Sequence, residues 1–276
     1  PSPTPTALIS FLHILDQLKK ENITCITGDG LEWLQKNVQS VDWLYIDPSR
    51  RNEAKGKVFL LADCEPNIPY LLADYWRYTH HILIKTAPLL DITAALRELE
   101  FVKNVVVVAV SNEVKELLFI LENGWTGPIT THAVAIHSRE DMHHYSYTRG
   151  ANSNIHLSLP QAYLYEPNAA LLKSGGQDYL AVEKQLKKLH PHTHLYTSNA
   201  CIEFPGRRFK IEAQMAYSKE SIKSISGKKY NIATRNFPET VETIRKKEKL
   251  KDGGDDYLFF VTLNDQRKVI LFTKKV

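Results

Sequence analysis

The chain has 276 residues, which is enough for one large domain or two smaller ones. Hydrophobic residues make up 43% and charged residues 24%, a globular composition that excludes a low-complexity or fibrous chain. The formal net charge of +4 does not by itself require a nucleic-acid partner. No apolar run reaches the length of a membrane-spanning helix, so we expect no membrane partner.

The first half of the chain alternates helices and strands. In chain order, periodicity and capping signals predict a helix over 7–20, a strand over 23–27, a helix over 31–36, a strand over 41–46, a loop over 52–57, a helix over 66–78, a strand over 81–85, a helix from the cap Asp91 through residue 99, a strand over 104–110, a helix over 112–121, and strands over 131–137 and 144–148. This order favours an α/β fold with a mainly parallel sheet covered on both faces and an antiparallel edge formed by the last strands.

The second half predicts a smaller α+β region, which follows a polar junction over 149–160. Its patterns indicate a unit that starts at 163–166, helices over 167–173 and 177–190, strands over 194–197 and 208–217, a helix over 218–224, a strand over 229–233, a charged helix over 240–250, and a hairpin of 256–263 with 267–273.

Cysteine usage indicates a reducing compartment. Cys25, Cys64 and Cys201 are odd in number and far apart, without the spacing of a metal site or a disulfide framework. We therefore expect free thiols in the cytoplasm and no bound metal. The alternating His190, His192 and His194 have no acid or cysteine nearby, so they predict surface or packing roles.

One stretch, V-D-W-L-Y-I-D-P-S-R-R over 41–51, organises the first half. Its apolar run predicts a buried strand, and Asp47 follows that strand where open α/β sheets bind ligands. Asp29 follows the strand predicted over 23–27 in the same way. A carboxylate at such a tip can accept hydrogen bonds from a nucleoside or an amine, but Asp29 can equally cap the helix that begins at Gly30.

Two further strand ends carry polar residues. Lys85 can bind an anion, or it can extend along the sheet end with its charge in water. Asn112 follows the strand over 104–110 and is a candidate substrate contact. From the residues alone, capping of the predicted helix by Ser111 or Asn112 is the simpler interpretation.

Several blocks of sequence together resemble one known family. They are I-T-G-D-G, Y-I-D-P-S-R-R, D-C-E-P-N, I-K-T-A-P-L-L-D, S-N-E-V-K-E-L-L, Y-L-Y-E-P-N-A-A-L-L-K, L-H-P-H-T-H-L-Y-T-S and F-P-G-R-R-F. The combination resembles a bacterial family of class I S-adenosylmethionine-dependent methyltransferases with a C-terminal THUMP-like domain. The resemblance implies a Rossmann-like methyltransferase domain over 1–155, a ferredoxin-like segment over 156–204 and a THUMP-like domain over 205–276.

The resemblance also implies roles for single residues. Asp29, with Gly30 beside it, matches the acidic position that contacts the adenine of S-adenosylmethionine. Asp47 and Pro48 match the start of the D-P-P-Y-like motif, in which the acid and a backbone carbonyl hold the target amine. Ser49 and Arg50 replace the second proline and the aromatic residue, so stacking on the base would fall to an arginine or be lost. Arg50 and Arg51 would suit phosphate or base contacts.

The family's glycine-rich first strand and ribose-binding acid should precede the helix over 7–20, and the sequence does not contain them. We therefore expect the sheet to be incomplete at its N-terminal side. Either residues precede Pro1 or the donor site is incomplete. On this basis we expect the chain alone to bind the methyl donor weakly or not at all, and to be inactive by itself.

The function implied is methylation of RNA, and of tRNA in particular, at a base nitrogen. Basic residues of the last third would hold the phosphate backbone: Arg207, Arg208, Lys228, Lys229, Arg235 and the helix over 240–250. That helix can also be simply solvated. Two alternatives stay open, namely a non-catalytic RNA-binding module and a methyltransferase of a protein or small molecule.

Overall fold

The structure, a computed structural model, describes residues 23–50, 60–151 and 153–276. The chain divides into two compact units. The N-terminal unit ends at Val105 and also takes in Leu117–Pro128, and the C-terminal unit consists of Val106–Glu116 and Ile129–Val276. Within the described ranges, no helix has the length and apolar character needed to span a membrane.

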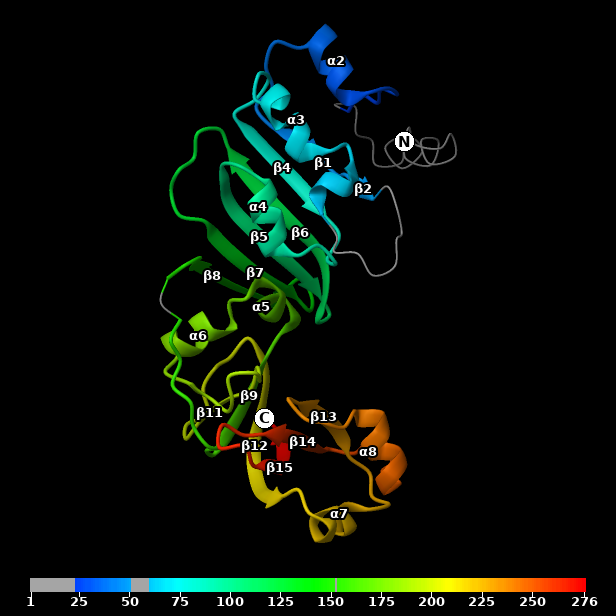
Figure 1. Cartoon of the computed structure of the whole chain (residues 1–276), viewed down its shortest axis with the longest axis vertical. Helices are drawn as coiled ribbons and strands as arrows, with labels where there is room; N and C mark the ends of the chain where they lie inside the picture. The colour runs from blue at the N-terminus through cyan, green and yellow to red at the C-terminus, as the bar shows by residue number, and fades with distance from the viewer. Residues whose placement is uncertain (1–22, 51–59, 152) are drawn as a thin grey trace. The chain divides into compact units, whose positions relative to one another are not determined.

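A mixed six-stranded sheet has the strand order β1-β4-β6-β5-β7-β8 (Figure 1). β1 is parallel to β4, whereas β6 is antiparallel to β4 and β8 is antiparallel to β7. The α/β class is therefore confirmed, with fewer parallel pairs than the alternation of elements predicts. The strands are β1 (Leu44–Ile46), β4 (His81–Thr86), β5 (Val102–Val110), β6 (Glu113–Glu122), β7 (Thr130–Ile136) and β8 (Met142–Thr148).

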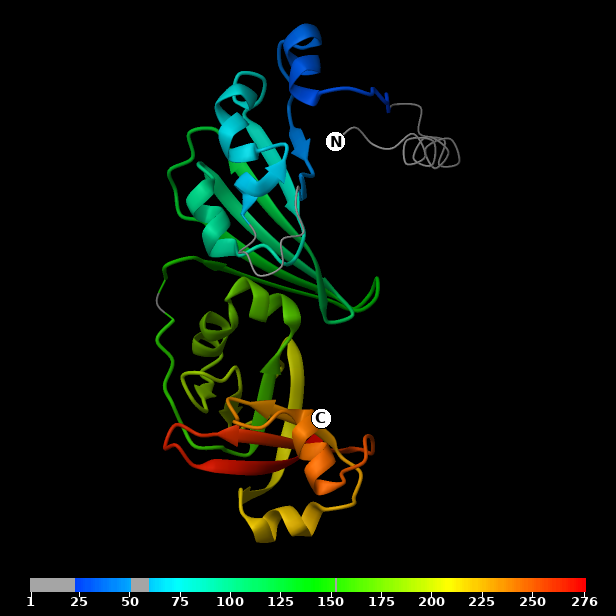
Figure 2. The same ribbon diagram turned by 45° about the vertical axis from the view of Figure 1, so that its right-hand side comes forward.

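The helices of the N-terminal unit begin at side-chain caps. Asp29, Asn67 and Asp91 each accept a hydrogen bond from a backbone N–H of the first turn, which satisfies one of the free donors there. Helices α3 and α4 lie beside β4, β5 and β6 (Figures 1 and 2). The elements are α2 (Gly30–Asn37), α3 (Ile68–Tyr75), α4 (Ile92–Glu98), the short 3-10 helix η1 (Leu61–Asp63), and the two-stranded pair β2 (Ser49–Arg50) and β3 (Cys64–Glu65).

The prediction of a helix over 112–121 is wrong, because these residues form strand β6. Ser111 and Asn112 make the turn from β5 with φ of 50° and 62°, the left-handed values that a tight two-residue hairpin turn requires. Leu117, Phe119 and Leu121 alternate on the strand and are fully buried. Burial of each contributes about 1.5–3 kcal/mol, which outweighs helix propensities that differ by about 0.7 kcal/mol per residue.

Other expectations in the first half need correction. Residues 23–27 form no strand, since Ile23 and Ile26 are exposed and leave such a strand without a buried face. β1 is shorter than the predicted strand over 41–46, and Tyr45 in it is 56% exposed. The reason is that β1 is the outermost strand of its sheet among the described residues. The helix over 7–20 and the loop over 52–57 lie outside the described residues.

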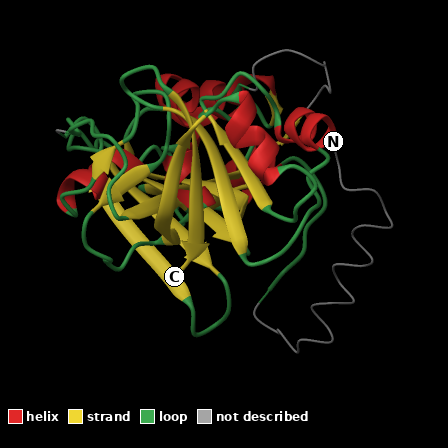
Figure 3. Cartoon of the chain, turned by 90° about the horizontal axis from the view of Figure 1, so that it is seen from below, coloured by secondary structure: helices red, strands yellow, loops and turns green. Residues whose placement is uncertain are grey.

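The C-terminal unit contains a seven-stranded sheet with the order β10-β11-β9-β12-β15-β14-β13. β13 and β14 are parallel, and the other pairs are antiparallel. Strands fan out with the twist usual for sheets (Figure 3). The strands are β9 (Tyr163–Pro167), β10 (Lys187–Lys188), β11 (Tyr196–Ser198), β12 (Gly206–Ala216), β13 (Asn231–Arg235), β14 (Asp256–Thr262) and β15 (Lys268–Lys275).

The side chains of β14 are buried on both faces of this sheet. Phe259 and Val261 belong to one apolar cluster, while Leu258 and Phe260 belong to another with Ile244 of α8. This double burial explains why β14 is almost continuously apolar. The hairpin predicted from β14 to β15 is confirmed. The helices of the unit are α5 (Ala169–Ser174), α6 (Gln177–Glu183), α7 (Lys219–Ile225) and α8 (Val241–Glu248).

The helix predicted over 177–190 is too long. It ends at Glu183, and Gln185 adopts a left-handed φ of 54° that turns the chain into β10. The helices predicted over 167–173, 218–224 and 240–250 begin within two residues of α5, α7 and α8, which Asn168, Ser218 and Thr240 cap with their side-chain oxygens.

Candidate functional site

The carboxyl ends of β1 and β4 bring an acid and a lysine together. Asp47 directly follows β1, and Lys85 is the last residue but one of β4. Because the two strands are parallel neighbours, their ends meet at one edge of the sheet. The Asp47 carboxylate lies 2.7 Å from the Lys85 ammonium nitrogen, and the Asp47 side chain is 48% exposed. A ligand can therefore reach this carboxylate from solvent.

The residues after Asp47 leave the sheet and form a separate β-pair. Pro48 is half-buried, and Ser49 begins β2, which pairs with β3. The Ser49 hydroxyl donates a hydrogen bond to the Glu65 carbonyl at 3.4 Å. The serine thus ties the segment to β3. The expected contacts of Arg50 and Arg51 with phosphate or base stay predictions, and Arg51 lies outside the described residues.

Asp29 caps a helix and also lines a cavity. Its Oδ1 accepts a hydrogen bond from the backbone N–H of Glu32 at 2.8 Å, so it caps α2. It also lines a cavity of about 450 Å³ together with Gly30 and the half-exposed indole of Trp33. Burial and then the negative charge of Asp29 raise the pKa of Tyr75 to about 12. Asp29 thus combines a helix cap with a place at the wall of the cavity.

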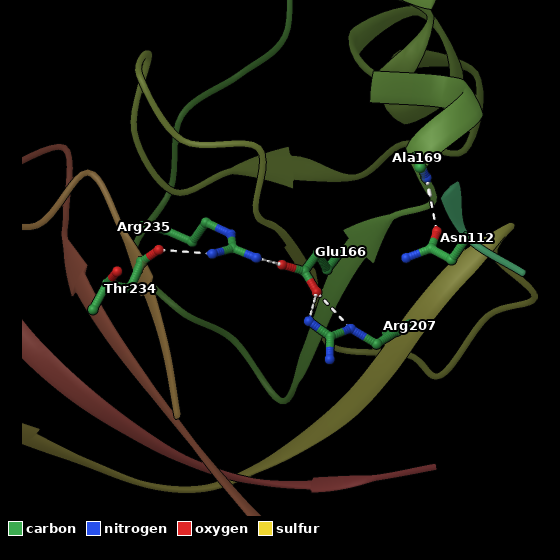
Figure 4. A network of polar contacts seen from close by, with 6 residues as sticks. All are labelled: Asn112, Glu166, Ala169, Arg207, Thr234 and Arg235. Carbon is green, nitrogen blue, oxygen red and sulfur yellow. Dashed lines mark hydrogen bonds and ion pairs between the residues drawn. The ribbon is translucent and has the colours of Figure 1, made fainter. Parts of the chain in front are cut away.

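In the C-terminal unit, Glu166 is buried between two arginines (Figure 4). Only 4% of Glu166 is exposed. Its Oε2 accepts a hydrogen bond from Arg207 Nε at 2.6 Å, and its Oε1 pairs with Arg235 Nη2. Arg235 also donates through Nη1 to the Thr234 carbonyl at 2.7 Å. One buried carboxylate thus fixes two guanidinium groups, each of which keeps further N–H donors.

A cavity of about 520 Å³ opens beside this arrangement. Arg207, Arg235 and Lys275 bring positive charge to its wall, and Glu166 and Asp141 bring negative charge. The cations outnumber the acids, so the cavity suits an anion. We call it the arginine cavity.

Asn112 lies at the same cavity but has a structural partner. Its Oδ1 accepts a hydrogen bond from the backbone N–H of Ala169 at 2.8 Å, at the first residue of α5 (Figure 4). Asn112 therefore helps to cap a helix, although a different one from the helix predicted to follow it. Its proposed contact with substrate stays a prediction.

Three of the remaining candidate cations, Arg208, Arg245 and Lys247, have acidic partners. Arg208 pairs with the exposed Glu203 at 2.6 Å and is not one of the lining residues of the arginine cavity. Arg245, in the basic helix α8, pairs with Asp252, and Lys247 lies 3.3 Å from Glu239. These partners reduce the positive charge that the helix presents. Within the part of the chain that the structure describes, no group of three or more His, Cys, Asp or Glu residues could hold a metal ion.

Comparisons with known proteins agree with this architecture. A ferredoxin-like domain model matches residues 163–205, and a THUMP domain-like model matches residues 206–275. No curated protein matches the chain. A solved structure, "Crystal structure of putative methyltransferase from Porphyromonas gingivalis W83", is 31% identical in sequence with a TM-score of 0.87. The similarity covers 99% of this chain and 70% of that chain.

The chain belongs to this methyltransferase family. The chain combines a mixed α/β sheet with a ferredoxin-like match and a THUMP-like match that follow it. In this methyltransferase, the Asp47–Lys85 pair lies in the α/β part, and Arg207 and Arg235 lie in the part matched by the THUMP-like model.

Sequence reasoning missed one residue that shapes the candidate site. Glu166 looks unremarkable in the sequence, since it is a single acid at the end of the short strand Y-L-Y-E-P. A usable signal is its place on β9 opposite Arg207 of β12, because acids inside a strand need a cationic partner when buried. Without the pairing register, that partner cannot be assigned.

Proposed function

We propose that this protein transfers a methyl group from S-adenosylmethionine to RNA, and to tRNA in particular, at a base nitrogen. The observation that carries this proposal is the exposed Asp47 carboxylate at the end of β1, paired with Lys85 in a chain of a methyltransferase family. The methyltransferase part would comprise 1–155, and the reaction would take place in the cytoplasm.

The donor site would include Asp29 and Gly30. In the described part of the chain, Asp29 uses only Oδ1 for the cap of α2, so Oδ2 can accept a hydrogen bond from the exocyclic amine of adenine. The cavity beside it contains the Trp33 ring and has room for a planar group. These residues therefore fit the adenosyl part of S-adenosylmethionine, which supplies the methyl group.

Asp47 would act on the acceptor side. The amine nitrogen of the target base attacks the methyl carbon, the bond from that carbon to sulfur breaks with its electron pair going to sulfur, and the nitrogen then loses a proton. Asp47 would hold the N–H of the amine through its carboxylate and accept the proton. The backbone carbonyl of Pro48 would take the second N–H. Lys85 would keep the Asp47 carboxylate in place through their ion pair.

The RNA would bind through the C-terminal part. The THUMP-like match and the arginine cavity support this assignment, since guanidinium groups bind phosphate with two parallel hydrogen bonds. Arg207 and Arg235 are the best-placed residues because they line the arginine cavity, and Arg208 is a weaker candidate because it does not.

The test is methyl transfer from donor labelled in the methyl group, with the complete protein and total RNA as acceptor. We expect label that ribonuclease releases and that is absent with Asp47→Asn. Label in a protein extract but none in RNA would overturn the RNA assignment. Binding of RNA without any transfer would favour a non-catalytic RNA-binding module.

A further inference from the structure

A second cavity of the C-terminal unit, about 440 Å³ in volume, differs in chemistry from the arginine cavity. Its polar walls include His190, His192, Asn236, Asn264 and Gln266. We call it the amide cavity. None of its lining residues is an aspartate, glutamate, lysine or arginine. A phosphate or carboxylate would therefore find no charged partner there, whereas a neutral polar group would find several hydrogen-bonding groups.

His190 supplies a donor whose tautomer is fixed by its neighbours. The residue is only 5% exposed, and its Nδ1 accepts a hydrogen bond from the backbone N–H of His192 at 3.0 Å. The Nδ2 of Asn236 also lies 3.0 Å from this nitrogen. Because Nδ1 is an acceptor, the proton of the neutral ring is on Nε2. The side-chain nitrogen of Gln266 lies 3.5 Å from this Nε2 and is itself a donor, so a ligand acceptor at Nε2–H would take its place. Burial and the neighbouring His192 lower the pKa of His190, which keeps the ring neutral.

Asn264 supplies an acceptor that lacks a partner. Its backbone N–H donates to the Leu189 carbonyl at 2.8 Å, which holds the residue in place. Its Oδ1 is buried and has no hydrogen-bond partner among the described residues. An unpaired buried acceptor costs about 1–3 kcal/mol. The oxygen is closed to solvent, so a ligand N–H recovers that energy when the Asn264 side chain, which lines the cavity, turns its oxygen inward. This oxygen is therefore an independent indication of a ligand.

We propose that the amide cavity binds one unpaired nucleobase of the RNA, and adenine in preference to the other bases. Asparagine and glutamine amides pair with adenine through its amino donor and the adjacent ring-nitrogen acceptor. The cavity has the Asn264 acceptor for the amino group and the His190 Nε2–H donor for a ring nitrogen. The exposed His192 ring offers a flat surface against which a base can stack, and Pro191 and Leu157 add apolar contact.

This inference rests on the proposed function and extends it. The arginine cavity would hold the backbone without regard to sequence, and the amide cavity would read a base. His190 and His192, two of the histidines that alternate in L-H-P-H-T-H-L, would then serve recognition as well as packing.

The test compares binding of labelled oligoadenylate and oligouridylate to the complete protein by fluorescence anisotropy. Two substitutions address the cavity. Asn264→Leu removes the acceptor, and Gln266→Gly removes a lining amide at a residue whose φ of 68° glycine adopts without strain. Gln214→Leu is the matched control, because Gln214 is an exposed amide of β12 that lines neither cavity.

We expect Asn264→Leu to weaken oligoadenylate binding about tenfold, within the range for a base-edge contact, and to leave oligouridylate binding unchanged. Gln266→Gly should weaken oligoadenylate binding in the same direction, and Gln214→Leu should have no effect. Free adenosine should compete for the cavity better than uridine. Equal binding of both oligomers by the unmodified protein would contradict the proposal that the amide cavity prefers adenine, while the proposal that the protein binds RNA would stand. Failure to bind any RNA would overturn the proposed function, and the base-reading role with it.

Discussion

The Asp47 carboxylate and the Lys85 ammonium group lie 2.7 Å apart, at the ends of two strands that are parallel neighbours. This pair is only partly buried, so its ion pair contributes at most about 1 kcal/mol to stability. The main effect of the ion pair is to hold the Asp47 carboxylate at the edge of the sheet where open α/β sheets bind ligands.

Lys85→Met should therefore lower methyl transfer more than it lowers stability. We expect a change of less than about 1 kcal/mol in the free energy of unfolding and a reduction in turnover of about tenfold, since a displaced carboxylate holds the amine poorly. Lys85→Arg should restore part of the turnover. Unchanged turnover in Lys85→Met would remove Lys85 from the site.

Glu166 and Glu203 offer a matched pair of carboxylates, each paired with an arginine. Glu166 is buried, whereas the side chain of Glu203 is 90% exposed. We expect Glu166→Gln to reduce the free energy of unfolding by about 1–3 kcal/mol, because a neutral amide replaces the buried carboxylate with which Arg207 and Arg235 pair. Glu203→Gln should cost less than about 1 kcal/mol. Chemical denaturation measures both, and equal losses would contradict the role assigned to burial.

Arg235 provides a test of backbone binding. If it contacts a phosphate, Arg235→Gln should weaken binding of all RNA sequences alike and reduce the slope of log affinity against log salt by about one unit. Arg97→Gln serves as control, since Arg97 is exposed on α4 in the N-terminal unit. An unchanged slope in Arg235→Gln would show that Arg235 contacts no phosphate of the RNA.

His190 makes stability depend on pH in a definite direction. Its pKa in the folded chain lies below its ordinary value of 6.5, because burial and His192 disfavour the charged ring. The unfolded chain thus takes up a proton at a higher pH than the folded one. The neutral His190 ring therefore contributes to the free energy of unfolding. That contribution is fully present above pH 6.5 and is lost as the pH falls through that value toward the pKa of His190 in the folded chain.

We accordingly expect the free energy of unfolding to decline between about pH 7 and pH 5 and His190→Asn to make the decline shallower. His156→Asn, at an exposed histidine, should leave the slope as in the unmodified protein. The measurement is denaturant unfolding across this pH range. A steeper decline in His190→Asn would contradict the assignment.

Local signals account for much of the fold. Helices α4, α7 and α8 begin directly after Asp91, Ser218 and Thr240, residue types that cap helices. The turn residues Asn264 and Asp265 likewise mark the final hairpin in the sequence. Strand β6 is predicted as a helix because the spacing of its apolar residues fits both the helical and the strand period. Its position between β4 and β5 in the sheet makes it a strand. Element identity there depends on partners distant in the sequence.

The candidate site divides in the same way. Asp47 and Lys85 can be placed at strand ends from their own neighbours, and their 2.7 Å contact follows once the strands are parallel neighbours. The pairing of Glu166 with Arg207 and Arg235 depends on the register of β9 with β12, which no local pattern specifies. Ion pairs between neighbouring strands can therefore be assigned only when the structure gives the strand register.

The most direct test of the account is methyl transfer by the Asp47→Asn variant of the complete protein, with labelled donor and RNA. Asparagine keeps the size of the side chain but cannot accept the amine proton, so we expect turnover to fall by about 100- to 10,000-fold. The free energy of unfolding should stay within about 1 kcal/mol of the unmodified protein. Turnover equal to that of the unmodified protein would contradict the central claim that Asp47 acts on the amine.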